Sequence, residues 1–183
     1  ARGYHHLPEL TAEAFDNGWF HTGDIGEFDE HDNLYITDRK KDLIKTSGGK
    51  YVAPQKVEAS LAANIPLLSQ AVVLGEGHKY IVALLALEER AVLRWGRRHG
   101  KSRATYADLI RDPELIAAMQ AGVDRANTRL ERWETVKKFA ILDYDMSSNK
   151  DLVTTSLKVR RSVVARQFHD LYESLYEADE TTA

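Results

Sequence analysis

The chain has 183 residues, of which 43% are hydrophobic, and a formal net charge of −3. This is enough for one moderate hydrophobic core, and without a basic excess nucleic acid is not expected as a general partner. The absence of cysteine excludes disulfides and thiolate metal sites, and no apolar run is long enough to predict a membrane span or a signal peptide. The chain starts at Ala1 inside motif-like sequence, which suggests a piece of a longer protein.

The first 37 residues are predicted to form β structure. Apolar segments at residues 25–28 and 34–37 flank a polar run, which is typical of strand, turn and strand. Residues 38–42 are all charged and predict an exposed connector between two packed units. Two further short strands, Leu43-Ile44 and Tyr51-Val52, are predicted around a Thr-Ser-Gly-Gly loop.

The remaining sequence alternates between helix and strand signals. A helix is predicted from Pro54, which suits a first helical position, to the Ile65-Pro66 stop. Gly75-Glu76-Gly77 predicts a hairpin between strands at 70–74 and 80–87. Further helices are predicted at 88–99, at 113 to about 133 and at 159–176, with a strand at 136–142 and a loop at 146–156. The three tryptophans are expected to serve packing. The expected fold class is α+β, a small mixed sheet flanked by helices.

Three motifs give this chain a family resemblance. They are Thr-Gly-Asp at 22–24, Asp-Arg-Lys-Lys-Asp at 38–42 followed by Gly48-Gly49, and Thr-Thr-Ser-Leu-Lys-Val-Arg-Arg at 154–161. Together they resemble the C-terminal part of the AMP-forming acyl-CoA synthetases (the adenylate-forming ligase superfamily), in particular the long-chain fatty-acid–CoA ligases. The resemblance implies that residues 1–37 end a large N-terminal domain, and that 38–183 form a C-terminal lid domain with a helical insertion at about 88–133.

The resemblance implies nucleotide-binding roles for Asp24, Arg39 and Lys45. Asp24 is expected to hold the ribose of ATP and of the acyl-adenylate, since a carboxylate can accept hydrogen bonds from both hydroxyls. Arg39 is expected to contact ribose and phosphate with its rigid fork of donors, and Lys45 to approach the nucleotide in one domain arrangement. The plainer alternative is that Asp24 caps the turn after Gly23 and that the charged run is a solvated connector.

Two further roles concern the movement of the lid and the acceptor. The resemblance makes Asp38 the hinge, where backbone torsions change as the small domain swings against the large one. It also places Gly48 and Gly49 along the pantetheine tunnel of CoA, where missing side chains let the backbone approach a thin arm. Adjacent glycines by themselves commonly mean no more than a turn.

Lys158 aligns with the catalytic lysine of the family. A cation there would stabilise the negative charge that develops when a carboxylate attacks the α-phosphorus of ATP. Many members have Gly before this lysine, and the Leu157 found here is interpreted as a mark of the long-chain branch. The alternative is a solvated lysine that forms a basic patch with Arg160 and Arg161.

The intact protein is thus expected to convert a fatty acid and ATP to acyl-AMP, and acyl-AMP and CoA to acyl-CoA, in the cytoplasm. The phosphate loop and the adenine motif of the superfamily are absent from this chain, so its main partner is expected to be its own N-terminal domain. Mg²⁺ is expected mainly on that domain, no metal site is predicted here, and the chain alone is expected to be inactive. Two alternatives stay open: an acyl-AMP ligase that transfers to a carrier protein, and a non-catalytic docking module in peripheral contact with a membrane.

Overall fold

The computed structural model describes residues 3–144, 146, 149, 151–154 and 159–180, in two compact units, Ala1–Leu43 and Ile44–Ala183. The first unit holds helix α1 (Pro8–Ala14), a short hairpin of β1 (Phe15–Asp16) and β2 (Trp19–Phe20), and a longer hairpin of β3 (Asp24–Phe28) and β4 (Leu34–Arg39). The longer hairpin confirms the predicted strand, turn and strand. Helix α1 is an addition to the predicted β structure, although Pro8 and Glu9 are favourable residues for a first helical turn.

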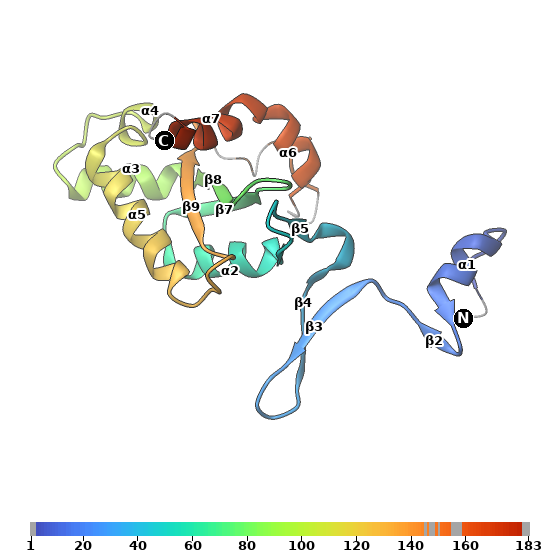
Figure 1. Cartoon of the computed structure of the whole chain (residues 1–183). Coiled ribbons are helices and arrows are strands. Elements are labelled where there is room, and N and C mark those ends of the chain that lie inside the picture. The colour runs from blue at the N-terminus through green and yellow to red at the C-terminus, as the bar shows by residue number, and fades with distance from the viewer. Residues whose placement is uncertain (1–2, 145, 147–148, 150, 155–158, 181–183) are drawn as a thin grey trace. The chain divides into compact units, whose positions relative to one another are not determined.

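The second unit is built on a three-stranded sheet in the order β7-β8-β9, shown in Figure 1. Strand β7 (Leu68–Leu74) pairs antiparallel with β8 (Ile81–Leu87), which confirms the predicted hairpin, and β9 (Val136–Ile141) pairs parallel with β8. A separate antiparallel pair is formed by β5 (Ile44–Lys45) and β6 (Tyr51–Val52). The turn η1 (Lys40–Asp42) precedes β5.

Helices cover both faces of this sheet. On one face lie α2 (Pro54–Asn64), α3 (Glu89–Arg98), α4 (Tyr106–Leu109) and α5 (Pro113–Asn127), and on the other lie α6 (Arg161–Gln167) and α7 (His169–Glu180). The mixed sheet with flanking helices confirms the expected α+β class.

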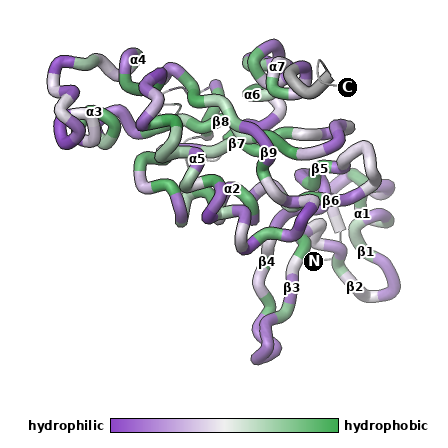
Figure 2. The backbone as a smooth tube through the Cα atoms, turned by 60° about the vertical axis from the view of Figure 1, so that its left-hand side comes forward, coloured by the Kyte–Doolittle hydropathy of each residue, from purple (hydrophilic) through white to green (hydrophobic). Residues whose placement is uncertain are grey.

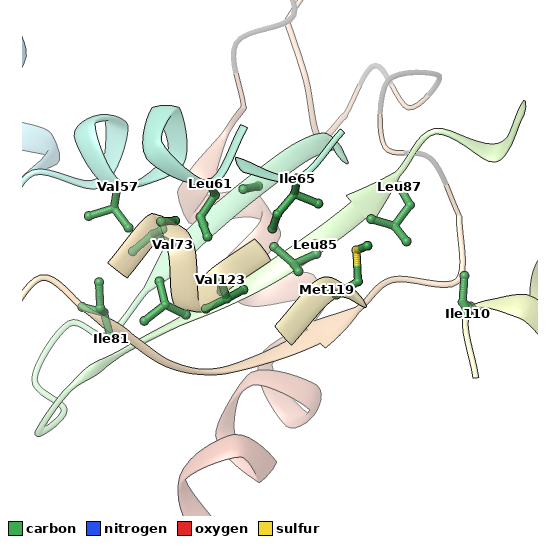
Figure 3. Close-up of a cluster of buried hydrophobic side chains, with 14 of the residues drawn as sticks. Val57, Leu61, Ile65, Val73, Ile81, Leu85, Leu87, Ile110, Met119 and Val123 are labelled. Atoms are coloured by element: carbon green, nitrogen blue, oxygen red, sulfur yellow. The ribbon is translucent and has the colours of Figure 1, made fainter. Parts of the chain in front are cut away.

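Strand β8 is buried over its whole length because both of its faces are covered. Its alternate residues Ile81, Ala83, Leu85 and Leu87 join the larger core, and Val82, Leu84 and Ala86 join the smaller one. Hydrophobic residues accordingly gather along β7 and β8 in Figure 2. Figure 3 shows the larger core, where side chains of α2 and α5 meet those of the sheet.

Close contact between α2 and α5 depends on a residue without a side chain. A Cβ at Gly122 of α5 would lie 2.5 Å from Cγ1 of Ile65 and 3.2 Å from the carbonyl oxygen of Asn64. The first distance is shorter than packed atoms allow and the second is tighter than most Cβ contacts, so glycine lets the two helices approach. Among the described residues, no helix is long and apolar enough to cross a membrane.

Two predicted helices have other bounds in the structure. The helix expected to reach about residue 133 ends at Asn127, whose side-chain amide binds both the N–H and the carbonyl of Val136 at 2.9 Å. These bonds connect the helix end to the start of β9. The helix expected over 159–176 is two helices, because the backbone leaves helical geometry at Phe168 (φ −108°, ψ 26°), whose ring packs into the smaller core.

Candidate functional site

Asp24 and Arg39, two of the predicted nucleotide-binding residues, are brought together by the β3–β4 hairpin. They are cross-strand partners, and Nε of Arg39 lies 3.0 Å from Oδ1 of Asp24. The chain reaches Asp24 through a tight turn. In this turn Gly23 has φ +74°, and the Thr22 hydroxyl accepts a hydrogen bond from the N–H of Asp24 at 3.1 Å. The Arg39 side chain is 66% exposed, so most of its guanidinium donors face solvent. The pair presents an acceptor and a fork of donors side by side.

Asp38, the predicted hinge, is the adjoining residue of β4 and is 2% exposed. Its Oδ1 accepts the backbone N–H of Arg39 at 2.6 Å. The connector predicted at 38–42 as open and solvated therefore begins with a buried carboxylate, and Asp38 and Arg39 still belong to a strand. Its role as a hinge remains a prediction.

Lys45, Gly48 and Gly49 lie together in the second unit, on and beside the tight turn between β5 and β6. Thr46 closes this turn: its N–H binds the carbonyl of Lys50 at 2.9 Å, and its hydroxyl accepts the N–H of Lys50 at 3.2 Å. Gly49 has φ +74°, which favours glycine, whereas Gly48 has no positive φ. No atom outside the adjoining residues lies within 4 Å of a Cβ built at either glycine, so the described residues leave this backbone open to an approaching molecule.

The turn between β7 and β8 is hydrogen-bonded to the loop that carries Gly48 and Gly49, called the glycine loop from here on. The Glu76 carboxylate accepts the N–H of Lys45 at 2.9 Å, the N–H of Gly77 binds the carbonyl of Lys45, and the N–H of Ser47 binds the carbonyl of His78. The sequence predicts Gly75-Glu76-Gly77 only as a hairpin turn, and it gives Glu76 no role at the glycine loop. No local signal identified this role, since its partner lies 31 residues away.

The side chain of His78 joins the same turn to helix α7. Its Nε2 lies 3.3 Å from the Glu173 carboxylate, and its ring stacks on Tyr176 with centroids 3.9 Å apart. Burial raises the pKa of the Tyr172 hydroxyl to about 12 and also raises the pKa of Tyr176. Both phenols therefore stay neutral around His78 at physiological pH. The glycine loop is thus connected to the C-terminal helix through a continuous set of contacts.

Two lysines of the loop region lie over aromatic rings. The Lys45 ammonium is 5.7 Å from the ring centre of Tyr51, and that of Lys50 is 4.9 Å from the ring of Trp133. The prediction that all three tryptophans serve packing is wrong for Trp19 and Trp133, which are 78% and 41% exposed. Trp95 does pack against the larger core.

Lys158 lies outside the described residues, but the chain on both sides of it is placed. Val153 and Val159 form an antiparallel bridge, and the N–H of Arg160 binds the carbonyl of Leu152 at 2.7 Å. Arg161 then reaches the outer edge of the sheet, where it contacts Glu58 at 2.6 Å and the carbonyl of Val73 at 3.2 Å.

The contacts of Arg161 bear on the docking alternative. Arg161 and Glu58 are 20% and 17% exposed, and Glu58 also accepts the N–H of Val73. Arg161 is therefore occupied within the fold, and a basic surface patch would lose one of its three cations. Among the described residues, no group of three or more histidine or acidic side chains could hold a metal ion.

Comparison with known proteins identifies the family. Residues 41–180 match the family described as AMP-binding enzyme C-terminal domain. The chain is 42% identical over 178 residues to the long-chain-fatty-acid–CoA ligase FadD15 of Mycobacterium tuberculosis, covering 97% of this chain and 30% of that protein. It is 32% identical to the long-chain-fatty-acid–CoA ligase ACSBG2 of Mus musculus, covering 95% of this chain and 29% of that one.

Solved structures agree with this relationship. The adenylation and carrier-domain (A-PCP) didomain of the carboxylic acid reductase from Segniliparus rugosus, in complex with AMP, matches with a TM-score of 0.70 and 26% identity over 98% of this chain and 24% of that chain. The chain thus spans less than a third of the length of these proteins. With its fold, its motifs and these similarities taken together, the chain belongs to the AMP-binding enzyme C-terminal domain family.

Proposed function

We propose that this chain is the C-terminal part of a long-chain fatty-acid–CoA ligase. The observation that carries the proposal is the Asp24–Arg39 pair, since the two residues that the family resemblance assigns to the nucleotide lie 3.0 Å apart. The identity to long-chain ligases over 97% of the chain supports the substrate class. Cytoplasmic location follows from the same proposal.

The first step forms an acyl-adenylate. A carboxylate oxygen of the fatty acid attacks the α-phosphorus of ATP, and the bond from that phosphorus to the pyrophosphate oxygen breaks. Asp24 and Arg39 orient the ribose and phosphate, and the ammonium of Lys158 stabilises the charge that grows on the phosphoryl oxygens in the transition state.

The second step uses the glycine loop. The lid turns about Asp38, which withdraws Lys158 and brings Gly48 and Gly49 to the acceptor. The thiol sulfur attacks the acyl carbon, the bond to the adenylate oxygen breaks, AMP leaves, and the thiol proton passes to solvent. Backbone without side chains suits this step because the pantetheine arm must pass close to it.

A measurement of the two half-reactions in the intact protein tests the proposal. Lys158→Ala should slow adenylation, followed by pyrophosphate exchange, about 10²- to 10³-fold, the range for losing one transition-state donor. Thioester formation from supplied acyl-adenylate should change little. Arg160→Ala is the matched control, since Arg160 is an exposed cation two residues away. Equal loss in both half-reactions would contradict the role of Lys158. Activity of the 183-residue chain alone with ATP, palmitate and CoA would contradict its dependence on an N-terminal domain.

A second candidate is transfer of the acyl group to a carrier protein instead of CoA. The similarity to the didomain of a carboxylic acid reductase favours it, because that protein joins an adenylation domain to a carrier domain. Acyl transfer by the intact protein to CoA, compared with transfer to a phosphopantetheinylated carrier domain, separates the two candidates.

A further inference from the structure

Helix α3 carries a row of exposed arginines that the proposed reaction does not use. The four residues follow the spacing i, i+4, i+7 and i+8, which places side chains on one face of a helix. This arginine row consists of Arg90, Arg94, Arg97 and Arg98, all of them exposed. On the opposite side of the helix Val92 and Gly96 are buried, and a Cβ at Gly96 would lie 2.7 Å from Cδ1 of Leu109 in α4. Because α3 is packed so closely on that side, the arginine row has a fixed outward direction.

The charge of this region is strongly positive. Residues 89–103 include six basic side chains and one acidic side chain, although the whole chain has a formal net charge of −3. In the part of the chain that the structure describes, Arg94 is the one member of the row with an ion pair, to Glu88 at 3.2 Å. The guanidinium groups of the other three arginines are therefore open to solvent.

The connection from α3 to α4 adds to this charge. It lies at the edge of the second unit in Figure 1, and Arg103 is exposed on it. Lys101 ties the connection to the fold, since its ammonium lies 2.6 Å from Asp112 and 2.7 Å from Glu114. Both of these carboxylates are thus occupied by Lys101.

The stability of the helix does not account for the arginine row. Like charges at positions i and i+4 destabilise a helix, and Arg94 stands in this relation to both Arg90 and Arg98. Cations are favourable in the last turn of a helix, which explains Arg97 and Arg98. Arg90 lies in the first turn, where the helix dipole disfavours a cation. The row therefore indicates a partner that carries negative charge.

The chemistry of the row fits a lipid surface better than a protein. Protein interfaces have an apolar core with aromatic or aliphatic anchors, but within α3, all of whose residues are described, no large hydrophobic side chain is exposed. An anionic bilayer attracts arginine through its surface potential and needs no such anchor. A long-chain fatty acid also leaves water for a bilayer, because each buried CH₂ group favours the transfer. The substrate of the proposed reaction is thus found where such a surface is.

We propose that the arginine row of α3 holds the protein reversibly on an anionic membrane surface. The guanidinium groups bind the phosphates of the lipid headgroups, and α3 lies on the headgroups without entering the apolar layer. The inference rests on the proposed function, since that function supplies the fatty acid as the reason for contact with a bilayer. Contact through charge alone brings the enzyme to its substrate and lets it leave again.

Binding of the intact protein to vesicles tests the proposal. The wild type should sediment with vesicles that mix phosphatidylglycerol with phosphatidylcholine, and less so as salt rises above about 0.15 M. It should not sediment with vesicles of phosphatidylcholine alone. The triple substitution Arg90→Gln, Arg97→Gln and Arg98→Gln should weaken binding about 10²-fold, from about fivefold for each arginine, equivalent to about 1 kcal/mol.

Two further variants are matched to this one. Lys79→Gln, Arg132→Gln and Lys137→Gln together remove the same charge from exposed positions outside α3 and should change vesicle binding little. Equal losses in the two triple variants would indicate an effect of net charge and overturn the site. Lysine at the three positions of the arginine row keeps the charge and should keep most of the binding, and a full loss in this variant would also contradict the proposal.

Other results would give the row a different partner. Equal binding to phosphatidylcholine alone would indicate an apolar contact and overturn the proposal. Acyl transfer to an acidic carrier protein that depends on the arginine row, without binding of the wild type to anionic vesicles, would assign the row to a protein.

Ligase activity separates this proposal from the proposed function. Formation of palmitoyl-CoA from palmitate in neutral detergent micelles should be equal in the wild type and in the arginine variant, since no anionic surface is present. If this activity is intact and the wild type does not bind anionic vesicles, the membrane surface alone fails. If the wild type forms no palmitoyl-CoA, the proposed function fails.

Discussion

Asp24 and Arg39 stand opposite one another in the β3–β4 hairpin, with Nε of Arg39 3.0 Å from Oδ1 of Asp24. The two residues are 15 positions apart in the chain, and antiparallel pairing brings a carboxylate and a guanidinium to one edge of the same hairpin. In this arrangement each side chain orients the other, and the remaining donors of Arg39 stay available for the proposed nucleotide.

Arg39→Lys should impair nucleotide binding while preserving the charge. A lysine ammonium lacks the planar fork, so we expect the KM for ATP of the intact protein to rise about tenfold, the equivalent of one charge-assisted hydrogen bond. Steady-state kinetics and pyrophosphate exchange measure the change. Glu27→Gln, on the exposed part of the same hairpin, is the control and should leave both values unchanged. An unaltered KM for ATP in Arg39→Lys would contradict a nucleotide contact by this guanidinium.

Glu76→Ala should slow thioester formation and spare adenylation. The substitution removes the carboxylate acceptor of the Lys45 N–H and loosens the glycine loop, so we expect the rate of acyl transfer to CoA to fall about threefold to tenfold, equivalent to about 1 kcal/mol for one solvent-exposed hydrogen bond. Glu76→Gln keeps an acceptor oxygen and should restore most of the rate. Lys79→Ala, at an exposed position of the same hairpin connection, is the control. Equal slowing of both half-reactions would show a general structural effect instead.

Arg161→Ala should destabilise the chain far more than Arg160→Ala. Removing Arg161 takes a close cationic partner from the mostly buried Glu58, at a cost of about 2–4 kcal/mol in the free energy of unfolding. Arg160 is exposed, and its loss should cost less than about 0.5 kcal/mol. Urea unfolding of the 183-residue chain measures both. Similar stabilities for the two variants would argue against the ion pair at the edge of the sheet.

Gly122→Ala should destabilise the chain although it replaces glycine by a better helix former. Propensity alone would favour alanine by about 1 kcal/mol, but the new Cβ would overlap Ile65, and overpacking of this kind costs about 1–3 kcal/mol. Thermal and urea unfolding measure whether the substitution raises or lowers the free energy of unfolding. The same substitution in an Ile65→Ala background should lose most of its cost. A stabilising Gly122→Ala would mean that α2 and α5 are farther apart than the structure has them.

Lys101 should make stability depend on pH through its ion pairs. Its ammonium lies 2.6 Å from Asp112 and 2.7 Å from Glu114. The hydrogen bond from Lys101 lowers the pKa of Asp112, and the hydrogen bond to Asp112 raises the pKa of Lys101. A lowered carboxyl pKa stabilises the fold above the unfolded pKa of about 4, and this is lost as pH falls through the folded value. A raised lysine pKa stabilises the fold below about pH 10, and this is lost as pH rises through the folded value.

Lys101→Gln should therefore lower stability most between about pH 5 and pH 9, and the difference from wild type should shrink below pH 3 and above pH 11. Urea unfolding across this pH range provides the measurement. Lys79→Gln, an exposed lysine outside these contacts, is the control. A difference that does not vary with pH would exclude the ion pairs as its origin.

Local signals in the sequence determined much of this protein. Alternation and turn residues predicted both hairpins, proline marked both ends of α2, and short motifs identified the family and suggested Asp24 and Arg39 as nucleotide-binding residues. These features depend on residues close together in the chain, where backbone preferences act directly. The predicted helix ends failed where distant residues decide them, as at Asn127, which binds Val136, and at Phe168, whose ring enters the smaller core.

Tertiary structure alone decided the contacts between segments far apart in the sequence. The brace from Glu76 to Lys45 spans 31 residues, and the contact from Arg161 to Glu58 spans 103. Lys50 meets Trp133 only because the end of the α5–β9 connection folds back beside the glycine loop. Such pairs depend on how the helices pack on the two faces of the sheet, and that packing follows from the burial of the whole core, which no short stretch of sequence contains.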